Sequence, residues 1–362
     1  MKMMVKEIML FSKEHSQKDT FENSPVTTSL ENIETIYFGG GTPSLLTILE
    51  IKRMIDTVRS HFPVDKNVEI TLEANPDDIN ESNLKGWKLA GINRLSLGVQ
   101  SFIKKDLEWM NRAHNAEQAL NSISLIKEVG FENFSIDLIY GTPGLDTADW
   151  KKNLQTAIDL KIPHLSCYAL TVEPNTPLKK MIHLKKSEDV DNEIQSIQFL
   201  LMVDELEKAG YEHYEISNFA LPGARSKHNS GYWQGKSYFG FGPSAHSFYG
   251  HQRSWNVSNN EMYIQSILKD TIPSTYEVLT STQQLNEYIM TAVRTSEGLD
   301  LQLVIDKFGE EKAGRLKSLM FKFQASGKAK IHDSKIILTK EGKLFADGIA
   351  ADLFFEEQNL VS

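Results

Sequence analysis

From Ile33 onward, short apolar segments alternate regularly with amphipathic helical segments. Alternating strands and helices predict a parallel sheet, either a closed barrel or an open doubly wound sheet. In both architectures ligands bind at the carboxyl ends of the strands. The predicted strands are Ile33–Phe38, Val68–Glu73, Arg94–Val99, Phe134–Ile139, His164–Leu170 and Tyr211–Ile216.

A run of three glycines, Gly39-Gly40-Gly41, follows the first predicted strand, and Thr42 and Pro43 lead into a helical pattern. Glycines let a ligand approach the main chain without meeting a Cβ atom. The N-terminus of a following helix would add N–H donors for an anionic group. The alternative interpretation is an ordinary glycine-rich turn between a strand and a helix.

Polar residues also end or follow the later strands. Glu73 ends the second strand, Gln100 follows the third and Asp137 lies in the fourth. Any one of them could be a solvated or capping side chain. With Thr42 after the first strand and Thr171 after the fifth, five successive strands have polar ends, which favours a shared pocket. Glu73, Asp137 and Arg112 together suit a zwitterionic ligand that carries hydroxyl groups.

The segment from Asn218 to about Asn256 interrupts this alternation and is rich in aromatic residues and glycine. It also contains His228, His246 and His251. Aromatic side chains beside histidines suit a flat apolar macrocycle that carries a metal. The alternative is a loop packed over the sheet, in which the histidines are ordinary hydrogen-bonded side chains.

The remaining chain suggests two flanking units. A helix from Met4 to about His15 and a polar loop from Gln17 to Thr28 precede the first strand. The C-terminal part resembles a winged helix, with helices and a hairpin, and Thr339 caps a last helix. We expect a barrel over residues 1–220, a connecting aromatic segment over 221–275 and a helical domain over 276–362, with a structural or docking role for the last.

Composition excludes several classes of protein. The 362 residues carry a net charge of −9, which argues against nucleic-acid binding. No apolar run is long enough to span a bilayer, and the polar N-terminus lacks a signal-peptide core. A single cysteine, Cys167, fits a reducing compartment and a cytoplasmic location, and it excludes an all-cysteine metal cluster held by this chain alone.

Several motifs together resemble the radical S-adenosylmethionine family, and within it the oxygen-independent coproporphyrinogen III oxidase-like branch. The similarity is greatest to the HemW-type heme chaperones. It implies a partial (β/α)6 TIM-like barrel with a helical C-terminal domain. The motifs are Tyr37–Pro43, Glu73–Pro76, Gly98–Phe102, Asn111-Arg112, Asp137–Gly141 and Gly240–Ser247.

The resemblance also assigns roles to residues. It implies that Gly40, Gly41 and Thr42 contact the methionyl end of S-adenosylmethionine. The run from His228 to Trp233 resembles the His-Asn-x-x-Tyr-Trp signature of the heme chaperones, so heme and heme-accepting proteins are the implied partners. The remaining implied contacts are Glu73, Gln100, Arg112 and Asp137 with the cofactor, Ala169 with its adenine, and His228, Tyr232 and Trp233 with heme.

One family feature is absent. The family places a Cys-x-x-x-Cys-x-x-Cys motif on the first barrel strand, where three thiolates hold a [4Fe–4S] cluster. This sequence contains neither that motif nor that strand. We therefore expect an N-terminally truncated form, with a cluster only in a full-length version and no radical chemistry in this chain.

Three hypotheses about function follow. The first is a heme-binding and heme-trafficking chaperone, which could touch a membrane transiently. The second is an oxygen-independent coproporphyrinogen III oxidase, which would decarboxylate porphyrinogen propionates. The third is a degenerate barrel that only docks partner proteins.

Overall fold

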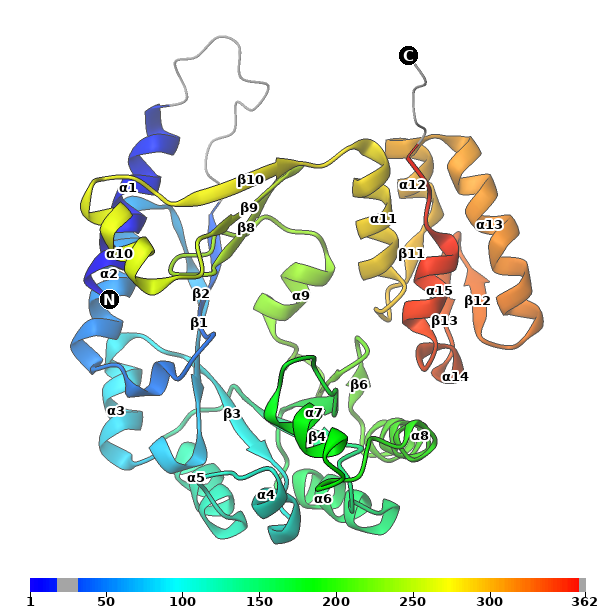
Figure 1. The fold of residues 1–362 in the computed structure, drawn as a ribbon, viewed down its shortest axis with the longest axis horizontal. Coiled ribbons are helices and arrows are strands. Elements are labelled where there is room, and N and C mark those ends of the chain that lie inside the picture. The colour runs from blue at the N-terminus through cyan, green and yellow to red at the C-terminus, as the bar shows by residue number, and fades with distance from the viewer. Residues whose placement is uncertain (18–31, 358–362) are drawn as a thin grey trace.

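The computed structural model describes residues 1–17 and 32–357. Its first element is helix α1 (Lys2–Gln17), which confirms the helix predicted from Met4 to about His15. Apart from Gln17, the predicted loop lies outside the described residues. Figure 1 shows α1 beside the edge of the main sheet, opposite the C-terminal helices.

The main sheet of the described chain has seven strands in the order β1-β2-β3-β4-β5-β7-β6. The first five run parallel to one another. They confirm five of the six predicted strands and form the partial barrel of Figure 1. These strands are β1 (Ile33–Phe38), β2 (Val64–Ala74), β3 (Arg94–Gln100), β4 (Phe134–Tyr140) and β5 (His164–Ala169).

The sixth predicted strand, Tyr211–Ile216, is wrong in extent and pairing. Only β6 (Glu212–His213) is extended there, and β7 (Asn218–Ala220) lies between it and β5. Both β5–β7 and β6–β7 are antiparallel pairs. The connection from β6 to β7 is too short for the crossover that a parallel pair requires.

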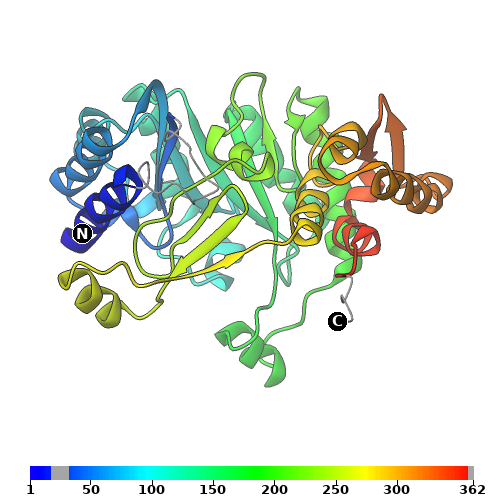
Figure 2. The same ribbon diagram turned by 90° about the horizontal axis from the view of Figure 1, so that it is seen from above.

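Helices cover one face of the parallel sheet, and the side chains on that face form the larger hydrophobic core. Leu72, Leu97 and Ile136, from three neighbouring strands, point toward these helices. The helices in turn pack the fully buried side chains of Trp87 and Trp150 against the strands. Figure 2 shows the helices outside the curved sheet. Besides α1, which contributes Val5, the helices in this core are α2 (Ile48–His61), α3 (Glu81–Ala90), α5 (Ala116–Glu128), α6 (Thr147–Asp159) and α8 (Asn192–Lys208).

Capping interactions define the ends of these helices. The Thr47 side chain and the Glu50 carboxylate form a capping box at the start of α2. Gly91 ends α3 in the left-handed conformation, with φ of 110°. Two shorter helices, α4 (Lys104–Trp109) and α7 (Pro177–His183), follow β3 and β5.

The aromatic segment is more ordered than the predicted loop. It contains α9 (Lys227–Trp233), which packs against β1, and two strands of a separate antiparallel sheet in the order β10-β9-β8. Figure 1 shows this second sheet above α9. The strands of this sheet are β8 (His246–Tyr249), β9 (Gln252–Asn256) and β10 (Ser274–Val278). Helix α10 (Asn260–Leu268) connects β9 to β10.

The C-terminal part has its own hydrophobic core, formed by residues between Leu285 and Leu353. The predicted hairpin is confirmed as β12–β13. The predicted last helix is wrong in one respect: Thr339 caps only the short α14, and the chain turns at Phe345 before α15. The elements are α11 (Ser281–Ala292), β11 (Leu299–Asp300), α12 (Leu301–Phe308), α13 (Glu310–Ala325), β12 (Ala329–His332), β13 (Lys335–Leu338), α14 (Lys340–Lys343) and α15 (Ala346–Leu353).

Among the described residues, no helix combines the length and the apolar character that a membrane crossing requires.

Candidate functional site

The face of the sheet that turns away from the helices is polar. Strand register places Glu73 beside Ser96, and Asp137 beside Ser166. Because alternate residues of a strand share a face, one polar array crosses four neighbouring strands. The polar residues predicted to share a pocket therefore extend along the inner face of the sheet as well as to the strand ends.

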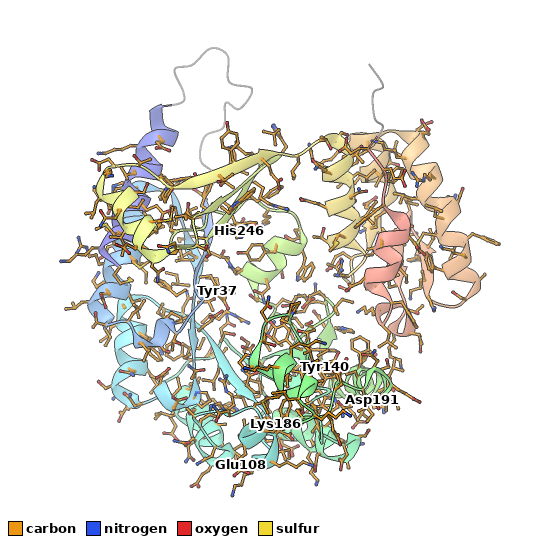
Figure 3. The ribbon with its side chains drawn as sticks, viewed as in Figure 1. Tyr37, Glu108, Tyr140, Lys186, Asp191 and His246 are labelled. Carbon is orange, nitrogen blue, oxygen red and sulfur yellow. The ribbon has the colours of Figure 1, made fainter. Side chains whose placement is uncertain are left out.

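Glu73 is the centre of the first group of contacts. Its Oε1 accepts a hydrogen bond of 2.7 Å from the Tyr37 hydroxyl, and its Oε2 accepts one of 3.2 Å from the Gly40 N–H. Burial, as the main cause, and the nearby Glu73 carboxylate, as the second, raise the pKa of the Tyr37 phenol above its usual range. The hydroxyl therefore stays protonated and acts as the hydrogen-bond donor. Figure 3 labels Tyr37 to the left of α9.

The glycine run differs in detail from the prediction. A Cβ at Gly39 would lie 2.5 Å from Tyr37 Cε1, and Gly40 has a φ of 82°. A Cβ at Gly40 or Gly41 would meet nothing within 4 Å, so this backbone is open to a ligand. The residues after Thr42 form only a short 3₁₀ turn, Pro43–Leu45, and α2 begins later at Ile48.

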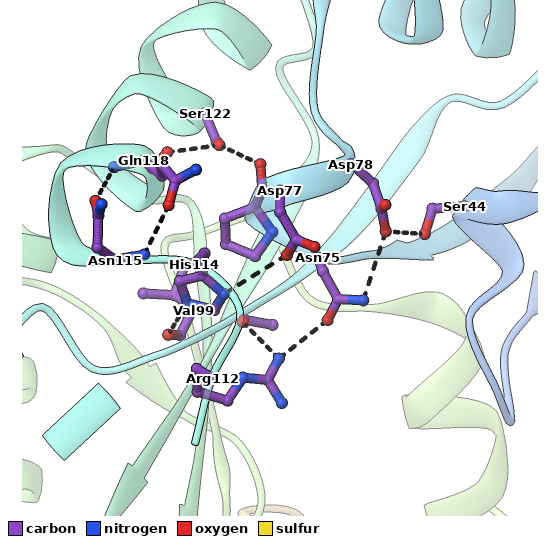
Figure 4. A network of polar contacts seen from close by, with 12 residues as sticks. Ser44, Asn75, Asp77, Asp78, Val99, Arg112, His114, Asn115, Gln118 and Ser122 are labelled. Carbon is purple, nitrogen blue, oxygen red and sulfur yellow. Dashed lines mark hydrogen bonds and ion pairs between the residues drawn. The ribbon is translucent and has the colours of Figure 1, made fainter. Parts of the chain in front are cut away.

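Gln100 and Arg112 meet around Gly98. A Cβ at Gly98 would lie 3.0 Å from Gln100 Nε2 and 3.5 Å from Arg112 Nη2. Arg112 Nη2 donates to Asn75 Oδ1 at 3.0 Å, as Figure 4 shows. The Nε of Arg112 is buried and has no hydrogen-bond partner in the described chain, which leaves one donor for a ligand.

Asp137 lies on β4, next to the β3 strand that carries Ser96 and Gln100. Its Oδ1 is 3.5 Å from the Ser96 hydroxyl, and Ser96 is the strand neighbour of Glu73. Desolvation, reinforced by the Glu73 charge, raises the pKa of Asp137 to about 7, although hydrogen bonds from Ser166 and Ser96 oppose the shift. The carboxyl group therefore titrates near neutral pH.

Ala169 differs from the other predicted cofactor residues. It alternates with Leu165 and Cys167 and packs against the helix-facing core. Its side chain therefore faces away from the polar array, although it ends β5 at the rim of the sheet. Only its backbone could contribute to the pocket.

His228 packs against β1 and α9 residues next to the polar array. Its Nδ1 lies 2.8 Å from Thr35 Oγ1, and its ring stacks on Tyr37 with the centroids 4.6 Å apart and the planes at 15°. Desolvation lowers the pKa of His228 to about 4, so the imidazole is neutral at pH 7. Tyr37 therefore connects His228 to Glu73, one of the predicted cofactor residues.

The other two predicted heme residues are placed differently from each other. Tyr232 lies one turn after His228 and contacts its ring edge to face, at 5.0 Å between centroids. Trp233 follows at the end of α9, about 140° around the helix from His228. The helix therefore presents His228 and Tyr232 together and turns Trp233 away from them.

Thr35 and Glu69 were missed by the sequence analysis, and Tyr37 received no role there. Buried Glu69 accepts hydrogen bonds from the N–H groups of Lys227 and His228, at 3.2 and 3.0 Å, and so anchors α9 to β2. Alternation along the strands could have revealed these residues, because every second residue of a strand lies on the same face. Thr35 shares a face with Tyr37, and Glu69 shares one with Thr71 and Glu73.

S-adenosylmethionine and the [4Fe–4S] cluster fit the residues of this chain to different degrees. The open backbone at Gly40 and Gly41, the Glu73 carboxylate and the unpaired Arg112 Nε suit S-adenosylmethionine. A three-thiolate cluster does not fit, because Cys167 is the single cysteine and is buried on the helix-facing side. Within the described ranges, no group of three His, Cys, Asp or Glu side chains could hold a metal ion.

Comparisons with known proteins agree with this architecture. Residues 27–157 match the radical SAM superfamily, and residues 279–345 match the HemN C-terminal domain. The solved structure of coproporphyrinogen III oxidase (HemN) from Escherichia coli has a TM-score of 0.79 over 98% of this chain and 82% of that one, at 21% identity. The fold and the site geometry thus define a radical SAM-type barrel with a HemN-like C-terminal domain.

Curated relatives narrow the family further. The heme chaperone HemW of Bacillus subtilis is 34% identical over 90% of this chain and 87% of its own length. HemW of Mycobacterium tuberculosis is 32% identical over 89% of this chain and 80% of its own. The chain belongs to the HemW heme chaperone family of the radical SAM superfamily.

Proposed function

We propose that the chain binds heme through His228 and delivers it to heme-accepting proteins, from a site that also holds S-adenosylmethionine. The observation that carries this proposal is the environment of His228. Thr35 Oγ1 contacts Nδ1, and in the tautomer that donates to Thr35 the lone pair is on Nε2. A neutral imidazole with one nitrogen hydrogen-bonded is typical of a metal-ligating histidine.

The direct test is titration of the full chain with ferric heme, followed by absorbance and electron paramagnetic resonance. We expect His228→Ala to lose the spectral signature of histidine ligation and to lower heme affinity at least tenfold. The lost Fe–N bond is the physical reason, and tenfold corresponds to about 1.4 kcal/mol.

The matched control is His246→Ala. His246 belongs to the same aromatic segment, but it is exposed on β8 and stacks on Trp255 instead of on the polar array. We expect this variant to bind heme as the parent does. An unchanged spectrum in His228→Ala, or a lost one in His246→Ala, would contradict the assignment of His228.

We also propose that Gly40, Gly41, Thr42, Glu73, Gln100, Arg112 and Asp137 surround S-adenosylmethionine, with Ala169 contributing its backbone. The sulfonium and ammonium groups of this ligand favour the anionic array of Glu73 and Asp137, and its carboxylate favours Arg112. When bound, the ligand would supply a nucleoside and a positively charged sulfur. The chain's own residues orient it and balance its charges.

The pH dependence of this binding follows from Asp137. Its pKa of about 7 means that the carboxyl group is neutral below that pH and ionised above it. Attraction for the sulfonium group therefore grows as pH rises. We expect S-adenosylmethionine affinity, measured by calorimetry, to increase by up to about tenfold between about pH 6 and about pH 8.

Two controls isolate this effect. Asp137→Asn has no titrating carboxyl group, and its binding curve should lack the rise. S-adenosylhomocysteine carries a neutral thioether in place of the sulfonium, so its affinity for the parent chain should change less. Equal pH profiles for the parent and Asp137→Asn would exclude Asp137 as the titrating group.

A further inference from the structure

Tyr37 touches both halves of the proposed site. Its hydroxyl donates to Glu73 Oε1 at 2.7 Å, and its ring lies flat against His228 at 4.6 Å between centroids. The two contacts use different parts of one side chain. A substitution can therefore remove the first contact and keep the second.

The hydroxyl fixes the direction of the Glu73 carboxylate. Glu73 has two donors, the Tyr37 hydroxyl on Oε1 and the Gly40 N–H on Oε2. A carboxylate has about four lone-pair sites, so two donors orient it and leave acceptor capacity for a ligand. Gly39 permits this arrangement, because a Cβ there would lie 2.8 Å from Glu73 Oε1.

The aromatic face fixes the plane of the His228 ring. Thr35 holds one ring nitrogen, and Tyr232 meets the ring edge to face. Those contacts alone would let the imidazole tilt about its bond to the helix. The flat contact with Tyr37, at 15° between the planes, restricts that tilt.

We propose that Tyr37 is a positioning residue for both ligands, its hydroxyl for the nucleoside cofactor and its ring for the heme-ligating histidine. This inference rests on the proposed function and adds a residue that acts through Glu73 and His228. It assigns separate roles to separate atoms of Tyr37. Substitution by phenylalanine and by leucine should therefore give different patterns of loss.

The test measures both affinities in the full chain, with S-adenosylmethionine by calorimetry and with ferric heme by absorbance. We expect Tyr37→Phe to weaken S-adenosylmethionine binding about fivefold to tenfold, the effect of one typical hydrogen bond, and to keep the parent heme spectrum. We expect Tyr37→Leu to weaken both and to shift the heme spectrum. Tighter heme binding by Tyr37→Phe than by Tyr37→Leu would show that the aromatic ring positions His228.

The matched control is Tyr211→Phe. Tyr211 is also buried, and its hydroxyl donates to the Ile162 carbonyl at 2.6 Å, away from the polar array. Tyr211→Phe should lower thermal stability but leave both affinities unchanged. If it lowered them as Tyr37→Phe does, a general loss of stability would explain the result and the inference would be overturned.

The remaining outcomes separate this inference from the proposed function. Unchanged cofactor affinity in Tyr37→Phe overturns the role of the hydroxyl. Equal heme binding in the leucine and phenylalanine variants overturns the role of the ring, provided that His228→Ala has lost its ligation. No heme binding by the parent chain overturns the proposed function and the role of the ring, while the calorimetric comparison still decides the role of the hydroxyl.

Discussion

Glu69→Ala is expected to lower the free energy of unfolding by about 3 kcal/mol and heme affinity by about tenfold. Glu69 is buried and accepts the N–H groups of Lys227 and His228. Its charge also stabilises the buried cation of Arg94. Desolvation lowers the pKa of Arg94, and the negative charge of Glu69 opposes that shift. Removing the carboxylate leaves a buried cation without its neighbour and α9 without its anchor. Chemical denaturation and heme titration measure the two effects.

The control for Glu69→Ala is Glu34→Ala. Glu34 also links the sheet to the aromatic segment, through an ion pair of 2.5 Å with Lys236, but both side chains are about half exposed. Exposed ion pairs contribute little, so we expect a change within about 1 kcal/mol and normal heme binding. A Glu69→Ala protein that is less stable but binds heme normally would show that another contact positions α9.

Glu7→Leu is the second substitution with a large expected effect. The Glu7 carboxylate is buried and accepts hydrogen bonds from the Gly242 N–H at 2.8 Å, Asn256 Nδ2 at 2.5 Å and the Tyr263 hydroxyl at 2.5 Å. Leucine would leave the Gly242 and Tyr263 donors buried without an acceptor, at about 1–3 kcal/mol each. We therefore expect the free energy of unfolding to fall by about 2–5 kcal/mol in denaturant titrations.

Lys6→Ala provides the comparison from the neighbouring position of α1. Lys6 forms an ion pair of 2.8 Å with Asp270, whose side chain is mostly exposed. We expect its removal to cost less than about 1 kcal/mol. Similar losses from Lys6→Ala and Glu7→Leu would mean that α1 is held by its apolar face, with Val5 and Ile8, and that the Glu7 hydrogen bonds add little.

The fold was predictable where local patterns and packing agree. Apolar segments that alternate with amphipathic helical segments located β1 to β5. The pattern failed at Tyr211–Ile216, because a short apolar run cannot reveal whether its strand pairs parallel or antiparallel. That choice depends on β7, which takes the place beside β5. The domain boundaries at 220 and 276 stay predictions.

The site was predictable where motifs carry it and hidden where the contacts are long-range. Glu73, Arg112 and His228 were named from motifs, and the structure brings Glu73 and His228 against Tyr37. Thr35 lies 193 residues from His228, so no local pattern connects them. The 3₁₀ turn after Thr42 was also hidden, because Thr-Pro followed by apolar residues is compatible with either kind of helix.

The attachment of α9 has a consequence for biosynthesis. Its links to β1 and β2 join residues separated by 158 to 193 positions. Contacts of such separation carry a large loop-closure entropy cost and therefore form late. A nascent chain that has reached β5 can therefore pair all five parallel strands while His228 is still untranslated. The proposed heme ligand is therefore synthesised after all the strands of the parallel sheet.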